Sequence, residues 1–191
     1  RLLVAPEGLR QGLLTRIERE AEHAKAGHPS GIKLKANSMV DEQIIDALYR
    51  ASNAGVPIEI WIRGICSIKA GVPGLSENIR VRSVLGRYLE HSRIYAFENA
   101  GDREVYIGSA DLMHRNLDRR IEVLARIVDR EHLARIDRFF AYGFSDDVSS
   151  WHMLPDGTWR RRTVTEEGEP LHDLQDLVMR DRTQARSRAA R

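Results

Sequence analysis

Two short hydrophobic runs on either side of an amphipathic segment constrain the fold of this chain more than any other feature. The run IKLKAN at residues 32–37 alternates apolar and polar side chains, and PIEIWIRG at residues 57–64 does the same. A period of two predicts β-strands, whereas the apolar spacing of residues 44–51 between them predicts a helix. A connection of this length makes the two strands parallel neighbours with a right-handed crossover, so we expect an α/β fold.

The boundaries of this strand-helix-strand unit bring two polar residues together. Ser38, followed three residues later by Asp41, resembles a helix cap, and a glycine and a proline after the helix end it. Asn37 and Arg63 come directly after the cores of the two strands. Ligands of open sheets gather beyond the carboxyl ends of the strands, so these two residues are candidates for one site.

The rest of the first 147 residues predicts a mixed sheet flanked by helices. Residues 9–27 have the three-to-four apolar spacing of an amphipathic helix, residues 64–80 form a long loop, and Asp129 can cap a later helix. The nearly continuous apolar run IEVLARIV, which starts at Ile121, indicates a strand covered on both faces. The remaining strands are expected at residues 81–85, 94–97 and 105–107, with a hairpin turn between the last two.

The hydrophobic pattern fades beyond Asp147, and we therefore expect two parts. Residues 1–147 form the domain, and residues 148–191 form an irregular C-terminal extension. Within the extension, a Pro-Asp-Gly turn at residues 155–157 between two tryptophans suggests a small hairpin, and the Arg-rich terminus is expected to fray. The fold class is α/β, a mixed sheet flanked by helices with an irregular tail.

The composition excludes several classes of protein. Apolar residues make up 42% of the 191 residues, without the roughly 20 consecutive ones that span a bilayer. The start shows no signal-peptide pattern, and the lone Cys66 cannot form an internal disulfide, so we expect a cytoplasmic protein. A net charge of +2 is too small to indicate nucleic-acid binding, although locally clustered arginines can bind smaller anions.

His91 is the strongest single candidate for chemistry. A neutral imidazole attacks phosphorus, or it exchanges a proton with a leaving oxygen. Its neighbour Arg93 could hold phosphate oxygens in a bidentate fork, and Ser109 with the backbone after Gly108 could add donors. The alternative is that His91 is a surface residue at the start of a strand and that the Gly-Ser pair is a plain turn.

Arg63 and Cys66 each have a functional and a structural interpretation. Arg63 opens the glycine-containing loop, where a planar guanidinium can meet a polyphosphate, but it could equally pair with a nearby acid. Cys66 is expected to be a packed thiol, because no histidine or helix start is placed to activate it. The remaining histidines lack metal-ligand spacing to cysteines or acids, so we expect no metal site within this chain.

Three segments of the chain carry a specific resemblance. LEHSRIYAFENAGDREVYIGSADLMHRNLDRRIEV, together with PSGIKLKANSMVDEQIIDALYRASNAGVPIEIWIRGICS and GLSENIRVRS, closely resembles the C-terminal catalytic domain of bacterial polyphosphate kinases of the long, polyphosphate-synthesising type. The likeness extends from about Leu2 to Phe144. It implies the second of two phospholipase-D-like halves that face each other across a tunnel. It also implies an enzyme that reversibly moves the terminal phosphate of ATP onto polyphosphate.

The resemblance assigns roles to particular residues. Arg63 and His91 match the two positions of this domain that bind ATP in the family, with His91 as the catalytic candidate. The superfamily pattern of a histidine, a lysine and a later acid is occupied here by His91, Arg93 and Glu98, and GSAD stands where a Gly-Ser pair and an asparagine are usual. Arginine in place of lysine is typical of this half of the kinases, which favours phosphotransfer over phosphodiester hydrolysis.

The resemblance further implies partners that lie outside this chain. The family's phosphorylated histidine, a nucleotide-contacting tyrosine and the magnesium-linked arginines all precede Arg1, so the isolated chain is expected to be inactive as a kinase. The expected ligands are ATP or ADP with Mg²⁺, and inorganic polyphosphate. We also expect contacts with the upstream domains and homo-oligomers of the full-length enzyme. The resemblance leaves open whether the full-length enzyme associates peripherally with a membrane. The polyphosphate path could be lined by Arg80, Arg82, Arg119 and Arg120.

Two other classes of function fit the same residues. A phospholipase-D-like phosphodiesterase could complete its site by dimerisation. A binding module could hold polyphosphate or nucleic acid through its arginines without catalysis, in which case its affinity would fall steeply with salt.

Overall fold

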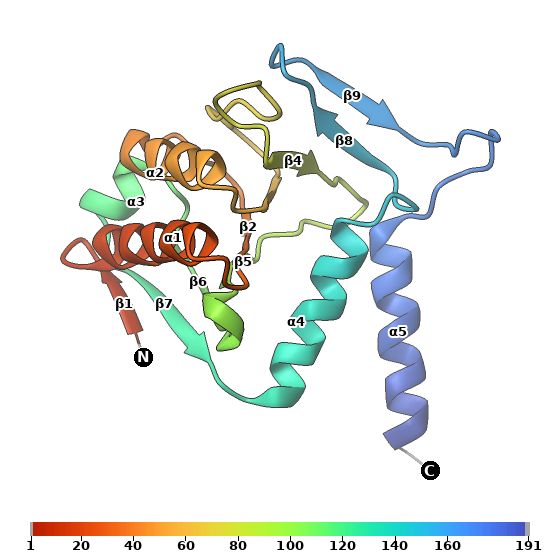
Figure 1. The fold of residues 1–191 in the computed structure, drawn as a ribbon. Helices are drawn as coiled ribbons and strands as arrows, with labels where there is room; N and C mark the ends of the chain where they lie inside the picture. Colours follow the sequence, from red (N-terminus) through yellow and green to blue (C-terminus); the bar gives the residue numbers. More distant parts are fainter. Residues whose placement is uncertain (1, 190–191) are drawn as a thin grey trace.

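The computed structural model describes residues 2–189, which form a single mixed sheet with helices on both faces (Figure 1). Within these residues the sheet has nine strands in the order β1-β7-β6-β5-β2-β3-β4-β8-β9. The strands are β1 (Leu2–Ala5), β2 (Ile32–Ala36), β3 (Ile58–Ile62), β4 (Ile79–Ser83), β5 (Arg93–Phe97), β6 (Glu104–Gly108), β7 (Glu122–Ile127), β8 (Ser150–Met153) and β9 (Trp159–Arg162). The helices are α1 (Leu9–Lys25), α2 (Glu42–Asn53), α3 (His114–Asp118), α4 (Arg130–Gly143) and α5 (Leu174–Ala189), with a 3-10 turn at Asn99–Gly101.

The predicted strand-helix-strand unit is confirmed by β2, α2 and β3. β2 and β3 are parallel, with Ile32 opposite Ile58, and β4 continues the parallel run. The predicted helix cap was misplaced by three residues, because Asp41 and not Ser38 caps α2. The side chain of Asp41 accepts a hydrogen bond of 3.1 Å from the backbone N–H of Ile44. A carboxylate at this position also opposes the positive end of the helix dipole.

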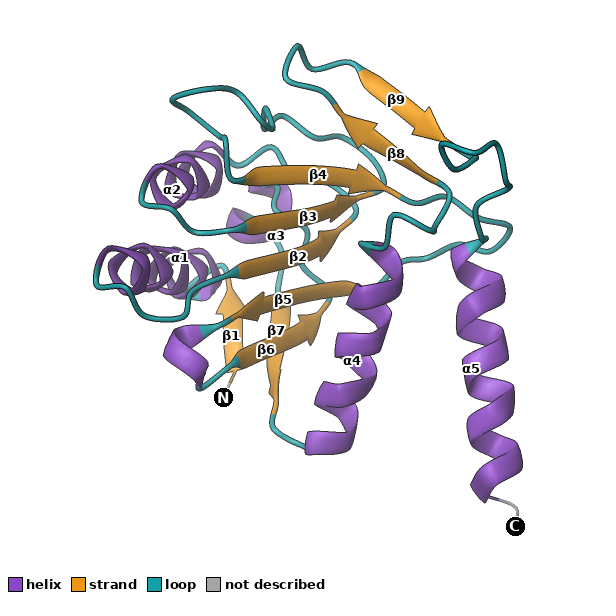
Figure 2. Cartoon of the chain, turned by 45° about the vertical axis from the view of Figure 1, so that its right-hand side comes forward, coloured by secondary structure: helices purple, strands orange, loops and turns teal. Residues whose placement is uncertain are grey.

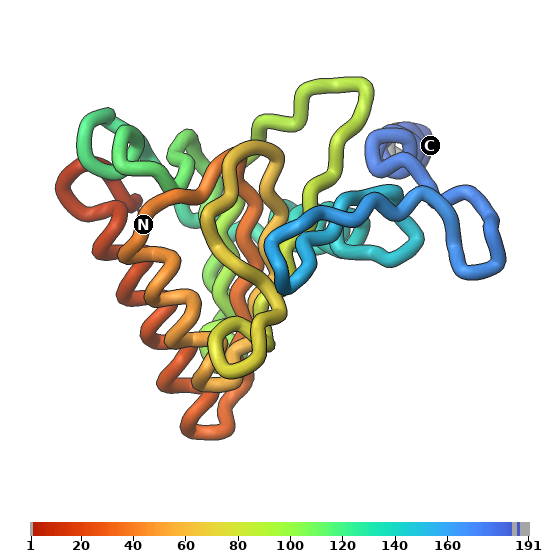
Figure 3. Tube along the Cα trace, turned by 90° about the horizontal axis from the view of Figure 1, so that it is seen from above, coloured from red at the N-terminus to blue at the C-terminus, as the bar shows by residue number. Residues whose placement is uncertain are grey.

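The helices lie on both faces of the sheet (Figure 3). Side chains that alternate along the strands pack against them. On one face, Leu34 and Ile60 belong to the main core together with apolar residues of α1 and α2. On the other face, Ile94 and Val105 pack against Phe140 of α4. Burial of these side chains supplies most of the stabilisation, at about 25 cal/mol for each Å² of apolar surface removed from water.

The strand β7 departs from the expectation of burial on both faces. Leu124 is completely buried on the α1 side, but Val123 on the opposite side is 37% exposed, and Ile121 just before the strand is 86% exposed. β7 lies between β6 and the edge strand β1, and α4 packs elsewhere on the sheet. The apolar run therefore indicated a strand correctly, but its burial depends on which elements cover it.

The C-terminal part adds to the sheet and is more regular than we expected (Figure 2). The predicted hairpin is confirmed as β8 and β9, and β8 pairs with β4, so the hairpin extends the same sheet. Most of the Arg-rich end, which we expected to fray, lies in helix α5 beside α4, and the last two residues of that expectation, 190 and 191, lie outside the described residues. Among the described residues, none of these helices has the length and hydropathy to cross a bilayer.

Candidate functional site

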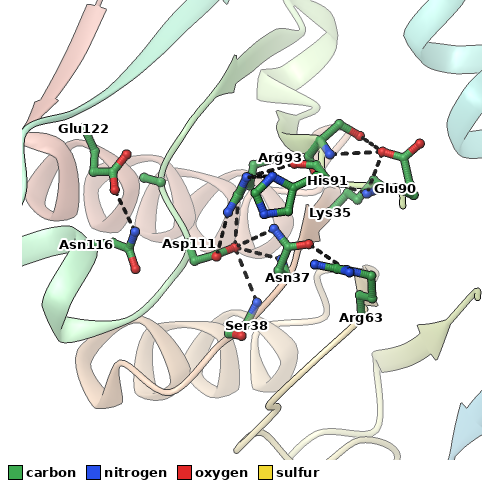
Figure 4. A network of polar contacts seen from close by, with 12 residues as sticks. Lys35, Asn37, Ser38, Arg63, Glu90, His91, Arg93, Asp111, Asn116 and Glu122 are labelled. Carbon is green, nitrogen blue, oxygen red and sulfur yellow. Dashed lines mark hydrogen bonds and ion pairs between the residues drawn. The ribbon is translucent and has the colours of Figure 1, made fainter. Parts of the chain in front are cut away.

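Three adjacent strands bring the candidate residues to one edge of the sheet. β2 and β3 are parallel, so Asn37 and Arg63, which follow them, lie at the same edge. β5 is antiparallel to β2, with Ile94 opposite Lys35, so β5 begins where β2 ends. Arg93, the first residue of β5, therefore lies beside Asn37, and Figure 4 shows these side chains joined in one polar network.

Asp111 is the centre of this network. One of its carboxylate oxygens accepts hydrogen bonds from the backbone N–H of Asn37 at 2.7 Å and from Nε of Arg93 at 3.2 Å. Its other oxygen accepts from Nη2 of Arg93 at 3.0 Å. Burial favours the neutral acid, but these hydrogen bonds outweigh it and hold the pKa of Asp111 below its ordinary value. The carboxylate is therefore ionised near neutral pH and fixes the orientation of Arg93.

Arg63 is held at its Nε atom and leaves the end of its guanidinium available. Nε donates a 2.9 Å hydrogen bond to Oδ1 of Asn37, whose own side chain is held by Asp111 at 3.4 Å. Within the described part of the chain, its two terminal nitrogens have no protein acceptor. Gly64 makes this arrangement possible, because its N–H reaches the Asn37 carbonyl at 2.6 Å and a Cβ atom would lie only 2.9 Å from that oxygen.

The contact between Arg93 and His91 determines the tautomer of the imidazole. Nη1 of Arg93 lies 2.9 Å from Nδ1 of His91 and also donates to the His91 carbonyl oxygen at 2.9 Å. A guanidinium has no acceptor, so Nδ1 must accept and the proton of the neutral ring resides on Nε2. His91 is exposed, and Nε2 can therefore donate to a ligand.

A buried lysine supports the segment that contains His91. The side chain of Lys35 is only 1% exposed, and its Nζ donates to the carbonyl of Ser92 at 3.0 Å and pairs with Glu90 at 3.2 Å. The ammonium also lies 4.7 Å from the centre of the Trp61 ring. Burial lowers the pKa of Lys35, Glu90 opposes this effect, and Arg63 and Arg93 reinforce it. Lys35 thus holds the Ser92 backbone after His91 and the Glu90 side chain before it.

The sequence-based candidates do not all belong to this network. Asn37, Arg63, His91 and Arg93 are brought together, whereas Ser109 is exposed and contacts the backbone of Val123. Sequence reasoning missed Asp111 and Lys35. For Asp111 there was a signal, since it occupies the last position of GSAD, where an asparagine is usual. For Lys35 the only signal was a second lysine on the polar side of a strand.

The prediction that Glu98 is the acid that accompanies His91 was wrong. It follows the last residue of β5, whereas Arg93 is the first, and a strand of this length separates its two ends by about 16 Å. Its backbone N–H donates to the Gly31 carbonyl at the opposite edge of the sheet. Asp111, and not Glu98, supplies the carboxylate that binds Arg93 and the backbone N–H of Asn37.

The four arginines predicted to line a polyanion path occupy different environments. Arg119 and Arg120 are exposed and lie between α3 and β7, at the same edge as Gly108 and Arg93. Arg80 lies opposite Glu59 near the start of β4, at the other edge. Arg82 is 7% exposed and is bound to the Ser145 carbonyl and to Asp146. The structure therefore brings neither Arg80 nor Arg82 to the network around Asp111.

The net charge of the network suits a phosphate better than a metal ion. Lys35, Arg63 and Arg93 contribute three positive charges against two negative charges of Glu90 and Asp111, and both carboxylates are already bound to cations. In residues 2–189 no group of three or more histidine, cysteine or acidic side chains is arranged to hold a metal. Cys66 is distinct from the network, and burial raises the pKa of its thiol to about 11, as expected for a packed side chain.

Comparisons with known proteins show the family to which the chain belongs. A family model described as "Polyphosphate kinase C-terminal domain 2" matches residues 2–175. The polyphosphate kinase of Streptomyces coelicolor is 56% identical over 189 residues, which are 99% of this chain and 25% of that protein. The chain thus spans about a quarter of the length of the curated relatives it matches.

Solved structures show the same architecture. The crystal structure of polyphosphate kinase from Porphyromonas gingivalis matches with a TM-score of 0.89 and 35% identity, over 97% of this chain and 28% of that one. A phospholipase D family member, Nuc from Salmonella typhimurium, matches with a TM-score of 0.54 and 17% identity, over 85% of this chain and 96% of that one. The second likeness concerns the fold alone.

Proposed function

Because the chain belongs to the family of polyphosphate kinase C-terminal domains, we propose that it supplies one half of the phosphoryl-transfer site of a longer polyphosphate kinase. In this reaction the terminal phosphate of ATP moves to the end of inorganic polyphosphate, and the reverse transfer regenerates ATP. The observation that carries the proposal is the convergence of Arg63 and His91 at one edge of the sheet, with Asp111 between them in the network.

Phosphoryl transfer depends mainly on positive charge and positioning around the equatorial phosphate oxygens. Arg63 is suited to this task because Asn37 fixes its Nε and leaves two terminal nitrogens for a bidentate contact with phosphate. Arg93 is held by Asp111, so its charge contributes to the field of the site while its orientation stays fixed. Asn37 and Asp111 act by positioning these two arginines.

His91 has a different part in the proposed mechanism. With Nδ1 accepting from Arg93, the Nε2–H donates a hydrogen bond to a phosphate oxygen of the nucleotide and stabilises the negative charge that develops there during transfer. The covalent phosphohistidine of the family is proposed to come from the upstream half, which faces this edge. Ser109, exposed near the same edge, is retained as a further candidate donor to phosphate.

Mg²⁺ is implied as the partner of ATP, and the residues of this edge do not fit a protein-bound ion. Asp111 and Glu90 are the carboxylates of the network, and each is neutralised by a cation at 3.0–3.2 Å. Oxygen ligands of Mg²⁺ must be free to coordinate it. We therefore propose that Mg²⁺ arrives with the nucleotide phosphates, and we assign none of its ligands to this chain.

The proposed polyphosphate chain would run along the exposed arginines of the same edge. Arg119 and Arg120 remain candidates for this path, whereas Arg82 is engaged with Asp146 and Arg80 lies at the other edge. We also propose that residues 1–147 form the catalytic half and that residues 148–191 are an extension of it. We further propose that this domain contacts the upstream domains of the full-length protein. The full-length protein is proposed to form homo-oligomers and to be located in the cytoplasm.

The proposal is tested by phosphoryl-transfer assays in both directions with the full-length protein. Arg63→Ala should lower kcat/KM at least about 100-fold, the magnitude expected for losing a charged bidentate contact in the transition state. Arg80→Ala is the matched control and should stay within about threefold of wild type. Equal rates for Arg63→Ala and wild type would refute the role of this edge.

The competing functions give different outcomes. The isolated chain should show no autophosphorylation from ATP, since the proposed site is only one half. Hydrolysis of bis-p-nitrophenyl phosphate by a dimer of the isolated chain would favour a phosphodiesterase instead. Polyphosphate binding that is lost with salt, with transfer activity unaffected by His91→Ala, would favour a non-catalytic binding module.

A further inference from the structure

The loop between β4 and β5 contains His91, although its middle buries little side-chain surface. We call residues 84–92 the His91 loop. Most of its middle is exposed, with Leu85 58%, Tyr88 55% and Leu89 72% accessible to solvent. Figure 3 shows it projecting beyond the end of the sheet. A segment of this kind is expected to sample several conformations unless specific contacts fix it.

The first specific contact comes from Lys35, which holds the end of the loop nearest β5. The second comes from the C-terminal extension. The side-chain amide of Gln175, in the first turn of α5, accepts from the backbone N–H of Tyr88 at 2.8 Å and donates to the Tyr88 carbonyl at 2.6 Å. One side chain thus satisfies both backbone groups of a residue 87 positions away, as a neighbouring strand would do.

Gly86 completes this contact from the side of the loop. A Cβ atom at position 86 would lie 2.5 Å from both Cδ and Oε1 of Gln175. Real carbon atoms do not approach so closely, so a side chain at position 86 would push the amide away from Tyr88. The absence of a side chain at Gly86 is therefore what allows Gln175 to lie against the loop.

Gln175 is itself firmly placed. Its backbone N–H donates to Oδ1 of Asp173 at 2.7 Å, and its neighbour Leu174 is 4% exposed in a cluster with Trp61 and Val84. The Trp61 ring is also the surface on which the Lys35 ammonium rests. Arg93 also holds His91 itself, and the contacts that Lys35 and Gln175 make with the rest of the His91 loop both rest on the same buried cluster.

We infer that Gln175 is a positioning residue for His91, and that the start of α5 belongs functionally to the phosphate site. This inference rests on the proposed role of His91 in binding the nucleotide. Releasing Tyr88 from Gln175 leaves His91 in its binding position for only part of the time. The apparent affinity for ATP then falls by that fraction, while the chemical step from the bound state is unchanged.

The test uses the full-length enzyme with Gln175→Ala, Gly86→Ala and the combination of both. Hydrogen exchange of the Tyr88 amide reports on the loop, and steady-state transfer gives KM for ATP and kcat. Gln184→Ala, an exposed glutamine further along α5, is the matched control. Loss of the two hydrogen bonds should speed exchange at Tyr88 roughly tenfold. KM for ATP should rise five- to tenfold, with kcat within about twofold of wild type.

The combined variant separates positioning from general damage. Because both substitutions break the same contact, their joint effect on KM should be no larger than either alone. Multiplying effects, unchanged KM, or a fall in kcat with unchanged KM would overturn the inference. The failure of the proposed function can be told apart from the failure of this inference. Full transfer activity of His91→Ala would show that His91 has no role in the reaction. Unchanged exchange of the Tyr88 amide in Gln175→Ala would show that Gln175 does not hold the loop.

Discussion

Asp111 binds Arg93 with both carboxylate oxygens, at 3.2 and 3.0 Å, although Arg93 begins β5 and Asp111 lies in the connection between β6 and α3. The same carboxylate receives the backbone N–H of Asn37, which stands at the end of β2. One buried anion therefore joins the end of β2 to the start of β5 and aligns the side chains that face the proposed phosphate. The site depends on this carboxylate even though Asp111 would itself repel a phosphate.

Replacement of this anion is the first prediction. Asp111→Asn preserves the shape of the side chain, but it removes the charge and turns one acceptor into a donor that faces Arg93. We expect the free energy of unfolding to fall by about 2–3 kcal/mol, as for the loss of a buried hydrogen bond to a charged group. Transfer activity of the full-length enzyme should fall at least about tenfold because Arg93 and His91 lose their alignment.

Denaturant unfolding and steady-state assays measure these two effects. Asp118→Asn is the control, because Asp118 is an exposed carboxylate on α3 that binds Arg10 and takes no part in the network. If Asp111→Asn and Asp118→Asn gave the same transfer rate, Asp111 would have no organising role.

The second prediction concerns the buried lysine beneath the His91 loop. Lys35→Met keeps the volume and removes the charge, which leaves Glu90 without its cation. Breaking a buried pair is strongly destabilising, but Glu90 remains 30% exposed, so we expect a loss of only about 2 kcal/mol in unfolding free energy. Lys33→Met on the same strand breaks a pair with Glu59 in which the lysine is far more exposed than Lys35, and it should cost less than about 1 kcal/mol. Chemical denaturation of both variants checks the difference, and equal losses would contradict the role of Lys35.

The third prediction is a loss of stability in mild acid that originates in β8. Burial, followed by the positive charges of Arg82 and Arg162, lowers the pKa of His152 from 6.5 to about 4. Stability is therefore complete above pH 6.5 and falls as the pH approaches 4, since the unfolded chain accepts a proton that the folded chain resists. After a discount for partial exposure, the expected loss is about 1–2 kcal/mol.

Unfolding at pH 7 and pH 5 in wild type and His152→Gln isolates this contribution. Glutamine cannot take up the proton, so the variant should lose less stability than wild type between these two values. An equal loss in both proteins would show that His152 does not contribute.

The sequence identified the edge of the sheet because the relevant pattern is local. Alternation at residues 32–37 and 57–64 marks two strands, and their ends mark Asn37 and Arg63. By contrast, Asp111 contacts Asn37 across a sequence separation of 74 residues, and no local spacing reveals that pairing. Glu98 was chosen by its place in a linear pattern, but an extended strand carries it away from His91.

The C-terminal helix α5 was not predicted from the sequence, for a different reason. Leu174, Leu177 and Val178 stand at positions i, i+3 and i+4, which is the spacing of a helix face, and they pack in the cluster around Trp61. The surrounding arginines obscured this signal and suggested a frayed end. The contact of Gln175 with Tyr88 had no signal at all, because it depends on the distance between two segments that only the folded sheet brings together.

The most direct test of the account is a crystal structure of the full-length enzyme with a non-hydrolysable ATP analogue and Mg²⁺. Phosphate oxygens are expected within about 3 Å of the terminal nitrogens of Arg63 and of Nε2 of His91, with Asp111 still bound to Arg93. Nucleotide phosphates bound at another surface, out of reach of both Arg63 and His91, would contradict the central claim.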